Sequence, residues 1–175
     1  MIAETERLVL RRPRVDDVPR LSFLRDPEVM RFIGGVEAVP VEELVRRWLD
    51  RWEANGFGYV LLERREDGAV VGRSGLVLWD TRGAWRPSTL AEADGRGQAE
   101  LGWALAREHW GNGYATEAAA AARRWAFEEL GIERLVSLTD PRNVRSIGVV
   151  DRLGGEPEQL VPTVHGPAIV WVHPR

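Results

Sequence analysis

The stretch AELGWALAREHWGNGYATEAAAAARRWAFEEL, residues 99–130, carries the pattern that decides the fold. Residues 99–105 alternate in polarity, which predicts a strand with one buried face. An alanine-rich helix is predicted over residues 114–130. Between them, Gly111 and Gly113 let backbone amides approach a ligand without obstruction by side chains. Because a helix N-terminus offers unpaired N–H groups and a positive dipole end, this order of elements predicts an anion site suited to a pyrophosphate.

This loop differs from two other phosphate-binding loops. The Gly-Lys-Ser/Thr of a P-loop is absent. The three-glycine spacing of the dinucleotide-binding fingerprint fails too, and the strand comes late in the chain. Taken alone, the two glycines are equally consistent with a tight strand-to-helix turn that binds nothing.

The elements on either side predict a mixed α/β domain. Strands are predicted over residues 6–12, 59–64, 69–79 and 134–139, with one or two more between 161 and 172, and helices over 15–24, 40–55 and 143–153. Residues 80–98, rich in glycine, proline and serine, are predicted as a long loop within one domain spanning residues 1–175. A surface insertion, a substrate lid and a subunit contact are the three interpretations of that loop.

The composition excludes several classes of site. The chain has 175 residues, no cysteine, three histidines and a formal net charge of −3. Disulfides, cysteine-ligated metals and cysteine nucleophiles are therefore excluded, and no metal site is expected. The acidic balance argues against direct nucleic-acid binding. No apolar run is long enough to span a membrane and the N-terminal residues form no secretory signal, so we expect a cytoplasmic protein without membrane contact.

Several ordered motifs together resemble the GNAT acyltransferase superfamily, and within it the RimJ/RimL-like branch. The motifs are Thr5-Glu6-Arg7-Leu8-Val9-Leu10-Arg11, Glu100-Leu101-Gly102-Trp103-Ala104-Leu105, Trp110-Gly111-Asn112-Gly113-Tyr114-Ala115, Asn143-Val144-Arg145-Ser146 and Leu153-Gly154-Gly155. Trp110 departs from the Gln/Arg of the superfamily's general loop motif, but this variant is common in the branch. The resemblance covers the whole chain except residues 80–98.

The resemblance implies a GNAT-like α/β (α+β) fold, with a mostly antiparallel central sheet flanked by helices and a splayed strand pair that holds the cofactor. It implies acetyl-CoA as co-substrate. The implied cofactor-binding residues are Trp103, Ala104, Leu105, Trp110, Gly111, Asn112, Gly113, Tyr114, Ala115, Thr116 and Asn143. Asn143 either orients the cofactor or caps a helix, and the two roles are compatible.

Two side chains are candidates for the proton transfers of acetyl transfer. Glu100 lies on the predicted central strand and is the candidate base, acting through water. The alternative is a polar residue that pairs with an arginine or only orients the substrate. Strand alternation places Glu100 on the face that also carries Gly102, which leaves room for a substrate. By the resemblance, Ser146 donates a proton to the leaving thiolate; a serine at a helix N-terminus is the alternative. His165 is a weaker candidate for a substrate contact, and His109 is expected to pack in the loop.

We therefore expect an acetyl-CoA-dependent N-acetyltransferase whose acceptor is the α-amine of a protein or peptide. An α-amine has a pKa of about 7.7–8.0, against about 10.4 for lysine, so a weak base suffices. A small-molecule amine, such as an antibiotic or a polyamine, is the alternative acceptor. A non-catalytic module that binds acyl-CoA is the alternative function. A homodimer is compatible with the family.

Overall fold

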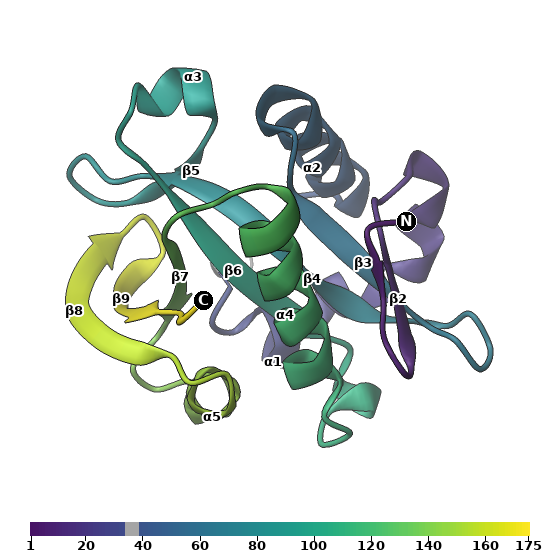
Figure 1. Ribbon diagram of the computed structural model, residues 1–175. Coiled ribbons are helices and arrows are strands. Elements are labelled where there is room, and N and C mark those ends of the chain that lie inside the picture. The colour runs from purple at the N-terminus through teal and green to yellow at the C-terminus, as the bar shows by residue number, and fades with distance from the viewer. Residues whose placement is uncertain (34–38) are drawn as a thin grey trace.

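The computed structural model describes residues 1–33 and 39–175. Within them nine strands form one sheet in the order β1-β2-β3-β4-β6-β7-β9-β8, with β5 paired to β4 (Figure 1). The strands are β1 (Ala3–Glu4), β2 (Leu8–Arg11), β3 (Tyr59–Arg64), β4 (Val70–Asp80), β5 (Arg86–Ser88), β6 (Gly97–Leu105), β7 (Leu135–Thr139), β8 (Glu156–Thr163) and β9 (Gly166–Val172). Only the β6–β7 pair is parallel among these strands. The predicted mixed, mostly antiparallel sheet is confirmed.

Helices cover both faces of this sheet (Figure 1). The α-helices are α1 (Pro27–Met30), α2 (Val41–Asn55), α3 (Leu90–Ala93), α4 (Tyr114–Arg124) and α5 (Val144–Arg152), joined by the 3₁₀ turns η1 (Val15–Arg20), η2 (Ser22–Arg25) and η3 (Arg107–His109) and by the π-helical turn η4 (Trp125–Glu129). Helix α4 packs on β4 and β6 through its alanine face. Helix α2, with α1 and η2, packs on the opposite face. None of the helices described here is long and apolar enough to cross a membrane.

Strand β6 directs its side chains to these two faces as its alternation predicts. Leu101 and Leu105 are buried against α4, whereas Ala104 belongs to the cluster around α2. Glu100 and Gly102 share the parity of Ala104 and so lie on the α2 face. The sheet therefore separates a closed core under α4 from a more open face that carries Glu100.

Strands β6 and β7 diverge after only two paired positions. Their register joins Ala99 to Leu135 and Glu100 to Val136 and then stops. At the point of divergence the Ser137 hydroxyl donates to the Leu101 carbonyl at 2.7 Å. Beyond it, residues 102–105 of β6 pair with β4 on one side only. The predicted splayed strand pair is thus confirmed.

A buried histidine completes the contact at this divergence. The Ser137 hydroxyl gives its one proton to Leu101, so it accepts from Nε2–H of His173 at 2.8 Å. His173 is buried, and its Nδ1 has no partner among the described residues. Burial lowers the pKa of His173 from 6.5 to about 4, and the charge of Arg123 adds to this effect.

We expect this histidine to make the fold acid-sensitive. The folded protein holds His173 neutral, whereas the unfolded chain binds a proton as the pH falls below 6.5, so stability decreases between pH 6.5 and 4. From pH 7 to pH 5 the free energy of unfolding should fall by about 2 kcal/mol on this account. Urea denaturation of wild type and His173→Gln at both pH values measures it, with His109→Gln as control. An equal pH dependence in His173→Gln and wild type would contradict the assignment.

Two predicted segments differ from the structure. Residues 15–24 form 3₁₀ turns rather than one α-helix, because Pro19 lacks the N–H that an α-helical ladder requires; Val15 is consequently 68% exposed. Residues 80–98, predicted as a loop, contain β5, α3 and the start of β6. Thr89 and Glu92 form a capping box there, and the Thr-x-x-Glu pattern was its signal in the sequence.

Candidate active site

The loop before α4 has the backbone that its glycines predict. Gly111 and Gly113 have φ angles of 79° and 80°, a left-handed conformation that glycine adopts without steric cost. Gly113 is the N-cap residue of α4, so the first N–H groups of Tyr114 and the residues after it have no partner within the helix. A Cβ built on Gly111 meets no atom within 4 Å, and one on Gly113 meets only Arg7 at 3.4 Å. The space above the loop is therefore free for a ligand.

The N-terminal strand holds this loop in place. Arg7 donates to the Asn112 carbonyl at 2.9 Å, pairs with Glu117 at 2.5 Å and lies over the Tyr114 ring. Thr5 donates to the same Glu117 carboxylate at 2.6 Å. Burial opposes ionisation of Glu117, but the hydrogen bonds from Thr5 and Arg7 prevail and keep its pKa below the usual value. The Thr-Glu-Arg motif of the resemblance thus has a structural role, which is to fix the loop.

A cavity of about 800 Å³, called the cofactor cavity below, extends from this loop along the open edge of β6. The predicted cofactor residues that line it are Trp103, Ala104, Leu105, Trp110, Gly111, Gly113, Tyr114, Ala115, Thr116 and Asn143. Asn112 does not line it, because its side chain donates to the His109 and Trp110 carbonyls inside the turn. His109 lines the cavity and meets Tyr114 edge-on, which agrees with the predicted packing in the loop.

Coenzyme A fits the chemistry of this cavity. The glycine loop and the free N–H groups of α4 suit a pyrophosphate, and the unpaired backbone of β6 suits the amides of a pantetheine arm. Arg145 and Arg152 add positive charge along α5, and Arg145 is stacked over the Trp110 ring, 4.4 Å from its centroid. Neither arginine was predicted as a site residue; the signal for Arg145 is its place inside the Asn143-x-x-Ser146 motif.

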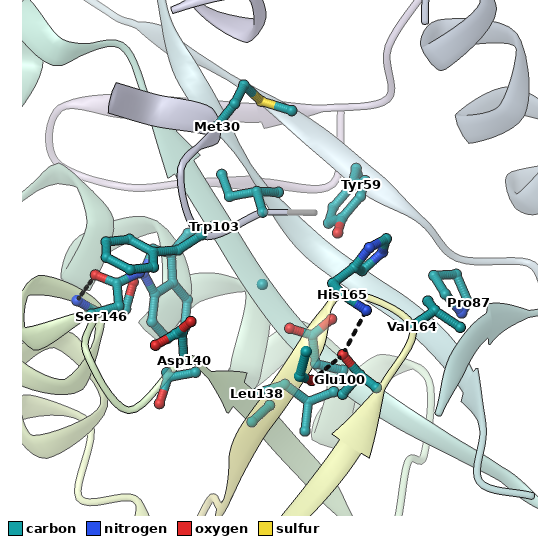
Figure 2. A pocket seen from close by; sticks show the side chains of 18 of the residues that line it. Met30, Tyr59, Pro87, Glu100, Trp103, Leu138, Asp140, Ser146, Val164 and His165 are labelled. Carbon is teal, nitrogen blue, oxygen red and sulfur yellow. Dashed lines mark hydrogen bonds between the residues drawn. The ribbon is translucent and has the colours of Figure 1, made fainter. Parts of the chain in front are cut away.

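A second cavity, of about 550 Å³, lies on the α2 face of the sheet (Figure 2). It is called the acceptor cavity below. Glu100 and Gly102 of β6, Tyr59 of β3 and Arg73 of β4 contribute to its lining, and the β8–β9 turn closes one end with His165. His165 also meets Trp79 edge-on. Both predicted acceptor-side residues, Glu100 and His165, are therefore in one cavity.

The two cavities meet at a shared wall. The residues that line both are Arg31, Phe32, Ile33, Trp103, Arg142, Asn143 and Ser146. Figure 2 shows Ser146 at one side of the acceptor cavity and Glu100 with His165 at the other. Glu100 lines the acceptor cavity only. This division gives Ser146 access to both ligands and Glu100 access to one.

Glu100 is a buried carboxylate whose surroundings shift its pKa. It is 7% exposed and accepts a hydrogen bond from the Trp79 indole at 3.0 Å. Burial raises the pKa of Glu100, while the Trp79 bond, the charge of Arg73 and the Leu138 amide act in the opposite direction. No ion pair joins Glu100 to an arginine within residues 1–33 and 39–175, so the pairing alternative lacks a partner at contact distance.

Asn143 and Ser146 are arranged by the start of α5. Asn143 is the N-cap residue, and its side-chain oxygen accepts from the Ser146 backbone N–H at 3.2 Å. The capping role expected of Asn143 is thus present. The cap fixes the first turn of α5, and with it the Ser146 side chain at the wall between the cavities.

Sequence reasoning missed two residues of the acceptor cavity. Arg73 is 4% exposed and lies over the Tyr59 ring, 3.7 Å from its centroid. Its signal was available, because it is a single charge in the otherwise uncharged stretch 69–79. Tyr59 opens β3 and was interpreted only as part of a strand. Burial raises the pKa of Tyr59, although Arg73 opposes the shift.

The chain is similar to acetyltransferases in both sequence and structure. A family model described as an acetyltransferase (GNAT) domain matches residues 7–156. The crystal structure of an acetyltransferase from Agrobacterium tumefaciens is 31% identical, with a TM-score of 0.79, covering 99% of this chain and 94% of that one. The uncharacterized protein YkkB of Bacillus subtilis is 29% identical (95% of this chain, 92% of that protein), and the N-acetyltransferase p20 of Bacillus licheniformis is 27% identical (90% and 83%).

A more distant structure, yncA from Salmonella typhimurium, was solved with its cofactor acetyl-CoA. It is 16% identical, with a TM-score of 0.71, and covers 96% of this chain and 93% of that one. The family match spans most of the chain and includes the glycine loop, Glu100 and Ser146. The chain therefore belongs to the GNAT family of acetyltransferases.

Proposed function

We propose that the protein N-acetylates a primary amine by direct attack in a ternary complex with acetyl-CoA. The observation that carries the proposal is that two cavities, one lined by the glycine loop and the other by Glu100, share Ser146 and Trp103 as lining residues. A ligand in each cavity can then meet the other at the shared wall. No residue has to carry the acetyl group in between.

Glu100 and Ser146 each take part in one of the two proton transfers. Acetyl-CoA supplies the acetyl group as a thioester. Glu100 accepts, through a water, the proton that the amine loses as its nitrogen–carbon bond forms and the carbon–sulfur bond breaks. Ser146 donates its hydroxyl proton to the departing thiolate and recovers it from solvent. Burial raises the pKa of Glu100, which strengthens it as a base.

The sequence motifs and the size of the acceptor cavity favour different kinds of acceptor. The RimJ/RimL-like motifs favour the α-amine of a protein or peptide. The acceptor cavity instead has the size range of a small-molecule site, because sites for such ligands span about 300–1,000 Å³. A panel of acceptors separates the two: peptides with a free α-amine, lysine peptides blocked at the N-terminus, amino acids and polyamines, each assayed by thiol release from acetyl-CoA.

We expect Ser146→Ala to lower kcat between about 10- and 100-fold while the Kd for acetyl-CoA changes little. The hydroxyl matters most as charge develops on sulfur, so its loss affects the transition state rather than binding. Stopped thiol-release assays and calorimetric titration measure the two quantities, with the exposed Ser22→Ala as control. A kcat within a factor of two of wild type would leave Ser146 a helix N-terminal serine only. Acetyl-CoA binding without thiol release for any amine would favour the non-catalytic module.

A further inference from the structure

Arg73 is a buried cation whose hydrogen-bond donors are only partly paired among the described residues. It lies in the middle of β4 opposite Ala104 of β6 and Leu61 of β3, on the face that carries the acceptor cavity. Its Nε and Nη1 have no hydrogen-bond partner in the part of the chain that the structure describes. Burying a charge without pairing it is costly. Arg73 also lines the acceptor cavity, so its charge favours an anionic group there, although Nε and Nη1 themselves are buried.

Aromatic residues hold the Arg73 side chain in place, and a side-chain hydrogen bond with Tyr59 contributes as well. The guanidinium lies 3.7 Å from the Tyr59 ring centroid and 5.5 Å from that of Trp48. A cation–π contact restricts the position of the group and compensates part of its desolvation. The guanidinium keeps its charge, and a planar acceptor such as a carboxylate is its complementary partner.

Further arginines line the same cavity and make it cationic. They are Arg25, Arg31, Arg47, Arg51 and Arg142. Burial lowers the pKa of Arg51, and the neighbouring charges of Arg47 and Arg73 add to this effect although Tyr59 opposes it. The acidic residues among the described lining are Glu100 and Asp140, and Asp140 is paired with Arg142 at 2.7 Å. Polycationic acceptors are repelled by such a cavity.

The positive and negative groups lie along one floor. A Cβ built on Gly102 would be 3.2 Å from Glu100 Oε1 and 3.5 Å from Tyr59 Cε1. Glu100, Gly102, Tyr59 and Arg73 thus follow one another across the cavity, with no side chain on Gly102 to separate them. An acceptor placed on this floor presents one end to a carboxylate and the other to a guanidinium.

We propose that the acceptor is a small primary amine that also carries a carboxylate, an amino acid or a close relative, with the carboxylate bound by Arg73 and the amine directed to Glu100. This proposal rests on the proposed N-acetylation and names its substrate class. It retains an α-amine as the acceptor group but replaces the protein chain by a small molecule. Arg51 assists by adding positive charge at the same end of the cavity.

A substrate panel tests the proposal directly. Thiol release from acetyl-CoA is measured with the natural L-amino acids, and each accepted one is compared with its amide and its decarboxylated amine. We expect kcat/KM to fall by about 100-fold or more when the carboxylate is removed, because a buried charge pair loses one partner. Spermidine and peptides with a free α-amine complete the panel.

The outcomes of the panel distinguish a wrong substrate class from a wrong reaction. Turnover of spermidine or of peptides together with none of the amino acids would overturn the proposal and leave N-acetylation intact. Equal kcat/KM for an amino acid and its decarboxylated amine would overturn it as well. If no amine in the panel releases thiol although acetyl-CoA binds, the proposed N-acetylation fails too, so the two failures are distinguishable.

Variants of Arg73 test whether this residue causes the preference for an acceptor with a carboxylate. Arg73→Met should lower kcat/KM for the accepted amino acid by about 100-fold, and it should abolish the preference over the decarboxylated amine. Arg73→Lys should restore part of that preference. The Kd for acetyl-CoA should stay unchanged, and Arg46→Met, at an exposed position of α2, is the matched control. If Arg73→Met fails to fold, Arg51→Met serves instead, with an expected loss of about 10-fold; an unchanged preference in a folded variant would overturn the assignment.

Discussion

Replacing Glu100 by glutamine is expected to lower kcat/KM by about 10²- to 10³-fold, within the range of a lost general base. Glutamine keeps the size of the side chain and an oxygen to accept from the Trp79 indole, so packing is preserved. It cannot accept the proton of the attacking amine. The loss should be largest for amines of high pKa and smallest for peptide α-amines, which need less help. Steady-state assays on both kinds of amine measure it, with Glu66→Gln, exposed in the β3–β4 turn, as control.

The pH profile separates a base from a structural carboxylate. The active form of Glu100 is the deprotonated one, so kcat/KM should rise with pH through the pKa of Glu100. Burial raises that pKa, so this acidic limb lies above the range of an ordinary glutamate. In Glu100→Gln the limb should be absent, leaving the titration of the amine. Identical profiles for the two enzymes on every acceptor would refute the base assignment.

Replacing Gly113 by valine is expected to weaken acetyl-CoA binding by about 100-fold or more. A branched side chain would press against Arg7, which holds the loop, and so displace the N–H groups of α4 that suit a pyrophosphate. The φ angle of 80° also strains any non-glycine residue, so some loss of stability accompanies the change. Calorimetric titration gives the Kd, and thermal unfolding gives the stability.

Gly131 offers a matched control for that strain. It has a φ angle of 64°, its Cβ position is open and it does not line the cofactor cavity. Gly131→Val should therefore lose comparable stability while keeping wild-type affinity for acetyl-CoA. If the two variants bind acetyl-CoA equally well, residues 110–116 do not hold the cofactor.

The sequence predicted those parts of the site that depend on local pattern. The glycine loop, the alternation of β6 and the cap at Asn143 are set by neighbours a few residues apart, and each leaves a readable spacing. The sequence marks Arg73 as the single charge in residues 69–79, but its stacking on Tyr59 depends on the pairing of β3 with β4 and leaves no local spacing. The joining of the two cavities depends likewise on how α1, β6 and α5 come together. Residues 15–24 show the converse: their apolar spacing is helical, but Pro19 changes the hydrogen bonding.

The parting of β6 from β7 also bears on self-association. Unpaired strand edges attract other chains, and proteins usually protect them. Here the open edge lies inside the sheet, with β7 and α5 beyond it, rather than at its rim. The Trp110 indole already covers the Leu105 carbonyl at 2.9 Å. An edge enclosed on its far side by other elements of the same chain is less accessible to a foreign sheet than a strand at the rim. The edge that is open to a ligand is therefore recessed within the fold and is not a rim strand of the sheet.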